Sequence, residues 1–162
     1  MDPVKVTIGT VENGVIYYLQ NGAGQLNFVA AEETTPQRMT WFLDKVPSFD
    51  DLENSPPMVV RSALDNRYLD LAGSFMSAGG GLYIPGILSV QPRGLRFAAA
   101  GQVVNGAAIA GGIITDDVNP TMTVGVRALA LPPDNQRQLA WRGFDNGMPD
   151  DALRAFIVSA LP

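Results

Sequence analysis

Short apolar segments separated by turn residues recur along the whole chain, and they constrain its fold more than any other feature. In the first segment Val4, Val6 and Ile8 alternate with polar residues, which is the period of a strand with one buried face. Val15 to Leu19 is rich in β-branched and aromatic residues, and apolar residues alternate again from Leu26 to Ala30. We therefore expect short strands rather than a bundle of helices.

Turn signals separate the predicted strands. Glu12-Asn13-Gly14 and Asn21-Gly22-Ala23-Gly24 follow the first two of them. Farther along, Met58 to Ala63 and Arg67 to Leu71 are predicted strands joined by a turn at Leu64-Asp65-Asn66. The same alternation of strand and turn continues into the last third of the chain, so the sequence predicts an all-β barrel or sandwich.

The C-terminal end departs from this pattern. Apolar residues there recur at spacings of three and four, as on one face of a helix: Leu153, Phe156, Ile157, Ala160 and Leu161. Asp150 precedes them at the position of an N-cap. We expect a short C-terminal helix, and a final strand from Ala155 to Ser159 is the alternative.

Two runs that contain Gln and Arg end in tryptophan. They are Pro36 to Trp41 and Asn135 to Trp141, and Gln91 to Phe97 is a weaker echo of them. Such recurrence indicates one strand unit used more than once. Large aromatic residues in apolar strands usually pack inward, so we expect both Trp side chains to anchor the core, with exposed stacking on a sugar as the alternative.

These segments carry a resemblance to a known family. Met58 to Leu71 resembles the first two strands of a ricin-B-type trefoil repeat, and the two runs ending in Trp resemble the Gln-x-Trp motif that closes such repeats. In composition and richness in loops the chain is also similar to fungal protease inhibitors of the mycocypin type. The resemblance implies a β-trefoil-like barrel over residues 1–162, as one all-β domain, and a carbohydrate-binding function.

Composition narrows the chemistry. Apolar residues make up 46% of the chain and charged residues 17%, a balance typical of a packed globule. The net charge is -5 and no dense Lys/Arg cluster is present, so neither nucleic acid nor an anionic membrane is an expected partner. The chain begins without the pattern of a secretion signal, which favours a soluble cytoplasmic protein, although a secreted protein without disulfides is also compatible.

Cysteine and histidine are both absent. Their absence excludes disulfides, thiolate and imidazole metal ligands, and nucleophiles activated by histidine. We expect no cofactor and no metal site. Catalysis, if there were any, would rely on carboxylates, Lys, Tyr or Ser, and an enzyme is therefore a less favoured interpretation than a binding protein.

The best candidate ligand site is the predicted turn and strand that contain Asp65, Asn66, Tyr68 and Asp70. A sugar site needs planar hydrogen-bonding groups for vicinal hydroxyls and an aromatic face for the apolar side of the ring, and these residue types supply both. The resemblance places Asp65 and Asn66 beside such a pocket. Asp-Asn is also a common turn for local reasons, and Tyr68 could belong to the core.

Two further functions use other parts of the chain. A protease inhibitor would present a rigid Pro-framed loop, and Ser48 to Pro57 and Asp116 to Pro120 have that character. A glycoside hydrolase would need two carboxylates across a cleft. The adjacent acidic pairs are Asp50-Asp51, Asp116-Asp117 and Asp150-Asp151. Adjacency alone favours solvated side chains or helix caps, so a glycan or a protease remains the expected partner.

Overall fold

The computed structural model describes residues 3–12, 14–44, 58–73, 76–78, 81–104, 107–115, 122–127, 137–143, 153–154 and 156–161. Within these ranges the protein is almost entirely β-strand, and the helices are single turns, η1 (Ala31–Glu33) and α1 (Pro36–Met39). Neither is long and apolar enough to cross a membrane. The strands are β1 (Val4–Glu12), β2 (Val15–Asn21), β3 (Leu26–Ala30), β4 (Trp41–Asp44), β5 (Val59–Ser62), β6 (Tyr68–Leu71), β7 (Met76–Ala78), β8 (Gly81–Ser89), β9 (Leu95–Val104), β10 (Ala107–Thr115), β11 (Met122–Arg127), β12 (Arg137–Gly143), β13 (Leu153–Arg154) and β14 (Phe156–Ala160).

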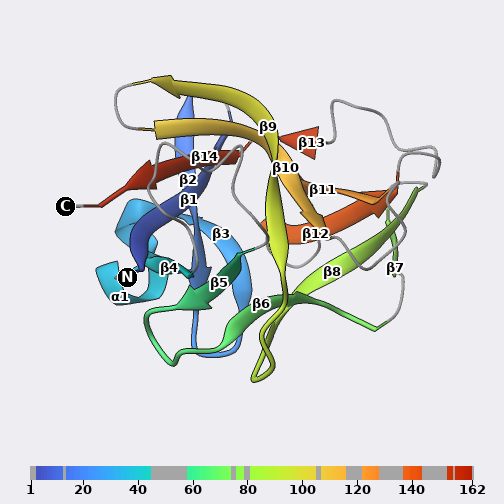
Figure 1. Ribbon diagram of the computed structural model, residues 1–162, viewed down its shortest axis with the longest axis horizontal. Helices are drawn as coiled ribbons and strands as arrows, with labels where there is room; N and C mark the ends of the chain where they lie inside the picture. The colour runs from blue at the N-terminus through green and yellow to red at the C-terminus, as the bar shows by residue number, and fades with distance from the viewer. Residues whose placement is uncertain are drawn as a thin grey trace.

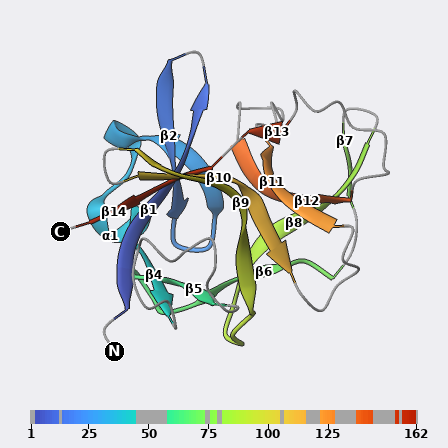
Figure 2. The same cartoon turned by 45° about the horizontal axis from the view of Figure 1, so that its top comes forward.

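The strands pair into a sheet that closes on itself (Figure 1). Its order among the described strands is β13-β11-β10-β14-β1-β2-β3-β12-β8-β6-β5-β4, and additional β1–β4 and β11–β12 pairings close it. Every one of these pairings is antiparallel. Figure 2 shows the long β9–β10 hairpin crossing the molecule beside β14, the strand with which β10 pairs. The all-β prediction is confirmed.

The C-terminal segment forms strands, so the predicted helix is wrong and the alternative of a final strand is correct. β14 lies between β1 and β10, with Ala160 opposite Val6 and Ser159 opposite Ala107. This pairing satisfies the backbone hydrogen-bonding groups of β14 and those of β1 and β10 that face it. A helix at this position would leave the groups of β1 and β10 without these partners. The spacing of the apolar residues fitted a helix, but Val158, whose side chain is fully buried, joins the core from a strand.

Pro85 and Gly86, residues that often interrupt strands, do not break the sheet here. β8 runs without interruption through both residues. Proline has no N–H to donate, but its carbonyl can still accept. The backbone N–H of Ala72 donates to the carbonyl of Pro85 over 2.9 Å, and Ala140 of β12 lies opposite Pro85.

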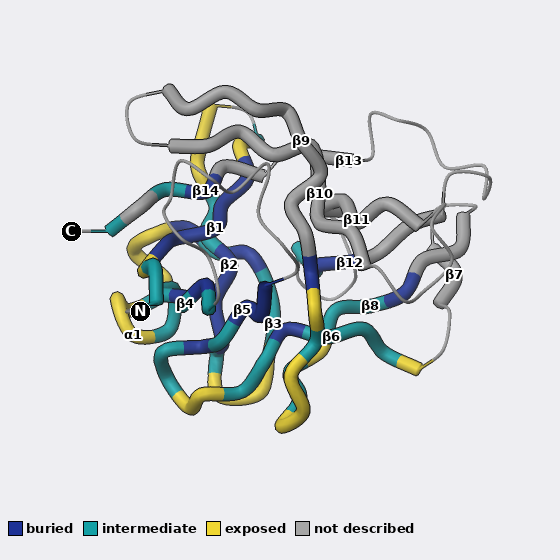
Figure 3. Tube along the Cα trace, in the orientation of Figure 1, coloured by how far each residue is buried: buried dark blue, intermediate teal, exposed yellow. Residues whose placement is uncertain are grey.

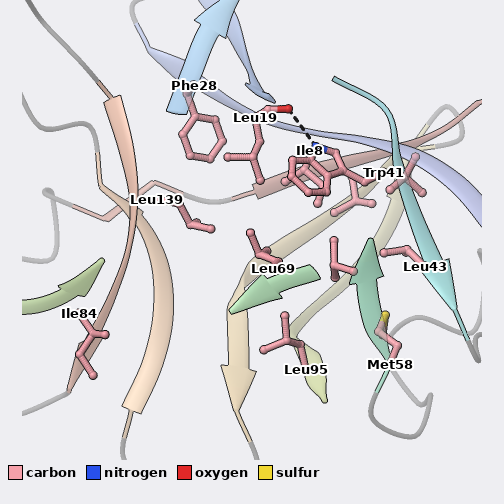
Figure 4. Packing of buried hydrophobic residues seen from close by; sticks show 13 residues of the cluster. Ile8, Leu19, Phe28, Trp41, Leu43, Met58, Leu69, Ile84, Leu95 and Leu139 are labelled. Carbon is pink, nitrogen blue, oxygen red and sulfur yellow. Dashed lines mark hydrogen bonds between the residues drawn. The ribbon is translucent and has the colours of Figure 1, made fainter. Parts of the chain in front are cut away.

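The core lies inside this closed sheet. Figure 3 shows the buried stretches of β1, β4 and β5 in dark blue, and Figure 4 shows the core side chains gathered from strands far apart in the sequence. The cluster consists of Val6, Ile8, Leu19, Phe28, Trp41, Leu43, Met58, Val60, Leu69, Ile84, Leu95, Leu139 and Val158. Burial of apolar surface on this scale is the main favourable term in folding.

Trp41 anchors the core, as the sequence predicted. Its side chain is fully buried, and its indole N–H donates to the backbone carbonyl of Leu19 over 2.9 Å, drawn as a dashed line in Figure 4. Trp141 lies in β12, but its side chain is outside the described part of the structure. β4 returns to pair with β1 as expected for a closing strand, whereas β14 rather than β12 pairs with β1 at the end of the chain.

Candidate functional site

The predicted site lies on the β5–β6 hairpin, whose turn is fixed by backbone hydrogen bonds. The N–H of Ser62 donates to the carbonyl of Arg67 over 2.8 Å, and the N–H of Asn66 donates to the carbonyl of Ser62 over 3.0 Å. Asn66 has a φ of 62°, in the left-handed region that asparagine tolerates better than other non-glycine residues. The turn therefore needs Asn66 for its backbone conformation, whatever its side chain does.

The carboxylate of Asp65 is held by Arg67. One oxygen accepts from the Arg67 backbone N–H over 3.1 Å, and the other accepts from the guanidinium at 2.8 Å from Nε and 2.7 Å from Nη2. Partial burial raises the pKa of Asp65, but hydrogen bonds from Arg67 and Asn21 and the charge of Arg67 together lower it by more. The pKa of Asp65 thus lies below its ordinary value of 3.8, and the group is an anion at neutral pH.

Asn66 is joined to a second arginine. Its side-chain carbonyl accepts from Nη1 of Arg61 over 2.7 Å, and Nε of Arg61 lies 3.2 Å from the carboxylate of Asp44. The Arg61 guanidinium also stacks 4.5 Å from the centre of the Phe42 ring. Cation-π contacts and ion pairs of this kind hold Arg61 in one geometry, so the amide of Asn66 is held as well.

Tyr68 and Asp70 lie on the outer side of β6. Side chains alternate along a strand, and Leu69 between them is fully buried in the core. Asp70 accepts a hydrogen bond from the N–H of Leu71 over 2.7 Å, and its carboxylate lies 3.8 Å from Nε of Arg93. Tyr68 is half-buried and lies opposite Arg61 in β5 and Ser89 in β8. The structure therefore places all four predicted residues on one hairpin, two in its turn and two on its outer face.

Sequence reasoning missed Asn21, which connects this hairpin to the rest of the molecule. The side chain is fully buried, its Nδ2 donates to the hydroxyl of Ser62 over 3.0 Å, and it also hydrogen-bonds to Asp65. Its Oδ1 accepts from the N–H of Gly24 over 3.2 Å in the β2–β3 turn. Asn21 stands in a run of turn-forming residues. That run predicted a turn between β2 and β3 but gave no sign of the contacts that Asn21 makes with the β5–β6 turn.

A second polar feature, also missed, is a row of three amide side chains across neighbouring strands. Gln20 of β2 lies opposite Asn27 of β3, and Asn27 lies opposite Gln138 of β12. Nε2 of Gln20 donates to Oδ1 of Asn27 over 3.0 Å. Gln20 lies one residue before the predicted Asn21-Gly22-Ala23-Gly24 turn and Asn27 three residues after it, so the turn alone did not predict their pairing, and nothing local pointed to Gln138.

The other predicted features lie outside the described residues. This applies to the loops from Ser48 to Pro57 and from Asp116 to Pro120, and to the acidic pairs Asp50-Asp51, Asp116-Asp117 and Asp150-Asp151. Within the described ranges, no group of three or more acidic side chains lies close enough together to hold a metal ion.

Comparison with known proteins defines the fold. The sequence matches no protein-family model, and no curated protein matches it significantly. The structure is similar to that of a ricin B-like lectin from Macrolepiota procera in complex with lactose, with a TM-score of 0.58 and 10% sequence identity. The match covers 98% of this chain and 96% of the lectin chain. The protein thus shares the β-trefoil fold of a ricin B-like lectin over nearly its whole length.

Proposed function

We propose that this protein binds carbohydrate, and that the outer side of the β5–β6 hairpin contacts the sugar. The observation that carries the proposal is the outward placement of Asn66, Tyr68 and Asp70 on one hairpin, whose turn is held in place by its contacts with Asn21 and Arg61. The fold similarity supports it, because the similar lectin is in complex with lactose.

Each residue has a distinct part in the proposed site. The amide of Asn66 and the carboxylate of Asp70 are planar groups that can engage neighbouring hydroxyls, and Tyr68 offers an aromatic ring to the apolar face of a pyranose. Asp65 is already bound to Arg67 on both oxygens, so its part is to position the turn. A site ordered before binding loses little entropy when the ligand arrives.

Glycan-array binding followed by titration tests the proposal. Asn66→Gly keeps the left-handed backbone available and removes the amide, and Tyr68→Ala removes the ring. Each should weaken sugar binding by about tenfold, which corresponds to roughly 1.4 kcal/mol. Gln37→Ala is the matched control, because it removes an exposed amide on α1, which is not part of the hairpin.

The same assays separate the alternatives. If no glycan binds and the protein inhibits a cysteine or serine protease, the carbohydrate proposal fails and a loop inhibitor replaces it. If a bound glycan is hydrolysed, the protein is a carboxylate-dependent glycosidase. If sugar binding survives both hairpin substitutions unchanged, the lectin function stands and the assignment of the β5–β6 hairpin is wrong.

A further inference from the structure

We infer that the outer face of β2, β3 and β12 is a second sugar-contacting surface, with Asn27 and Gln138 as the contact residues and Gln20 as a positioning residue. This inference rests on the proposed carbohydrate-binding function and adds a separate surface to it. The class of ligand is an uncharged glycan, recognised through its hydroxyls.

The row geometry is the first argument. Residues directly opposite one another in antiparallel strands have Cβ atoms about 4.5–5.5 Å apart and lie on the same face of the sheet. Gln20, Asn27 and Gln138 are joined in this way across three strands. Three amides in line place several hydrogen-bond donors and acceptors side by side, which suits a ligand that carries several hydroxyls.

The side-chain oxygen of Gln20 lacks a hydrogen-bond partner in the described part of the structure. Its side chain is 7% exposed, and its Oε1 is buried without a hydrogen-bond partner among the described residues. A buried amide oxygen without a partner costs about 1–3 kcal/mol, so its retention in a well-packed hairpin needs a reason. Because Oε1 of Gln20 is buried, the ligand contacts fall to Asn27 and Gln138, and the Gln20 amide is retained for its hydrogen bond to Asn27.

Gln20 also fixes the orientation of Asn27. Because Oδ1 of Asn27 accepts from Gln20, the Nδ2 donor of Asn27 is directed away from β2. Gly22 makes room for this arrangement, since a Cβ at that position would come within 3.1 Å of Nε2 of Gln20. Asn27 and Gln138 are both half-buried, so part of each residue is accessible to solvent.

The surroundings suit a neutral sugar. Tyr18 lies two residues from Gln20 on the same side of β2 and is half-buried, opposite Gly9 in β1 and Val29 in β3. It places an aromatic ring beside the amides. The nearby Arg137 faces the opposite side of the sheet, where its guanidinium stacks 3.8 Å from the centre of the Tyr17 ring and its Nε lies 2.7 Å from Glu12. The three amide side chains and Tyr18 therefore carry no formal charge.

This surface is distinct from the β5–β6 hairpin. Gln20 and Asn21 are consecutive residues of β2, so their side chains lie on opposite faces of the strand. Asn21 points inward to Ser62, whereas Gln20 contacts Asn27 on the outer face. Two glycans, or one glycan with two branches, could occupy the two surfaces together. A branched glycan that reaches both surfaces would bind with a higher apparent affinity than either branch alone.

Side-chain amide resonances in nitrogen-15 NMR spectra provide the direct test. Lactose, chitobiose and mannobiose are titrated separately into the labelled full-length protein, together with the best disaccharide found on the array. The NH₂ signals of Asn27 and Gln138 should shift with the titration, whereas that of Gln25, an exposed amide in the adjoining turn, should not.

Substitutions then separate contact from positioning. Asn27→Asp keeps an acceptor for Gln20 and removes the donor, so it should lower affinity at this surface by about tenfold without lowering the unfolding temperature. Gln138→Ala should do the same, and Gln25→Ala is the control. Gln20→Leu should weaken binding less than Asn27→Asp does, whereas a lower unfolding temperature with unchanged sugar affinity would show that Gln20 has a purely structural role in the hairpin.

Each outcome decides between the two surfaces. Shifts confined to Asn66 would overturn the second surface and leave the β5–β6 proposal intact. Shifts confined to Asn27 and Gln138 would confirm the second surface and remove the first. If no saccharide shifts the NH₂ signals of Asn66, Asn27 or Gln138, both proposed surfaces are wrong. The array result then decides whether the protein binds carbohydrate at another place.

Discussion

The β2–β3 and β5–β6 hairpins use polar side chains in contrasting ways. In the β5–β6 turn, Asp65 is bound to Arg67 and Asn66 to Arg61, so the turn is held by its own charged groups. On the outer face of β2–β3, the amide of Gln20 is bound to Asn27 on one side only, and its oxygen has no partner within the described residues. The contacts in the β5–β6 turn fix the conformation of its backbone. The amides on β2–β3 keep hydrogen-bonding groups that no described residue uses.

Asn21 makes the two hairpins dependent on each other. It bonds to Gly24 in one turn and to Ser62 and Asp65 in the other. A buried amide with partners on both sides is costly to disturb, because every partner loses a hydrogen bond at once. The ordered turn and the open amide row therefore depend on one shared buried residue, Asn21.

The largest effect is expected from the core beneath both hairpins. Trp41→Ala should lower the free energy of unfolding by about 3–5 kcal/mol, because it creates a cavity and leaves the carbonyl of Leu19 without its donor. Chemical denaturation followed by circular dichroism measures the change. Trp41→Phe should cost less, since it keeps most of the packing, and an equal cost for both would mean that the indole N–H dominates.

Breaking the link between the hairpins should have the next largest effect. Asn21→Ala should cost about 1–3 kcal/mol of unfolding free energy, because Ser62 and Gly24 each lose a buried partner. A double-mutant cycle with Ser62→Ala should show a coupling energy of about 0.5–3 kcal/mol. Additive effects would show that the two turns are energetically independent.

Each of the two turns contains a non-glycine residue with a positive φ. Asn66 and Ala23 have φ values of 62° and 59°, and the β carbon of alanine is disfavoured there. Ala23→Asn should stabilise the β2–β3 turn by up to about 1 kcal/mol, whereas Asn66→Ala should destabilise the β5–β6 turn by a similar amount. Thermal unfolding of the two variants checks the opposite signs, and a fall in stability for Ala23→Asn would contradict the argument.

The sequence predicted the strands better than their partners. Period-two alternation and turn residues located β1, β2, β3, β5 and β6 within a few residues, because those signals are local. The C-terminal helix was wrong because the pairing of β14 with β1 and β10 depends on strands more than forty residues away. The turn at Asp65 and Asn66 was predicted because its signal is also local. The contact of Asn21 with Ser62 and the position of Gln138 opposite Asn27 depend on distant strands, so the sequence did not predict them.

The smallest expected effect is the pH dependence contributed by Asp65. Its pKa in the folded protein lies below the ordinary value of 3.8, so its ion pair with Arg67 stabilises the fold fully at pH values well above 3.8. That contribution is lost as the pH falls below 3.8 and through the folded pKa. The pair is solvent-accessible, so the effect is small and salt should weaken it. Unfolding temperatures measured across this acid range should fall less steeply for Asp65→Asn than for the unchanged protein. Equal slopes would show that the Arg67 contact, unlike the buried Asn21 link, contributes nothing to holding the turn.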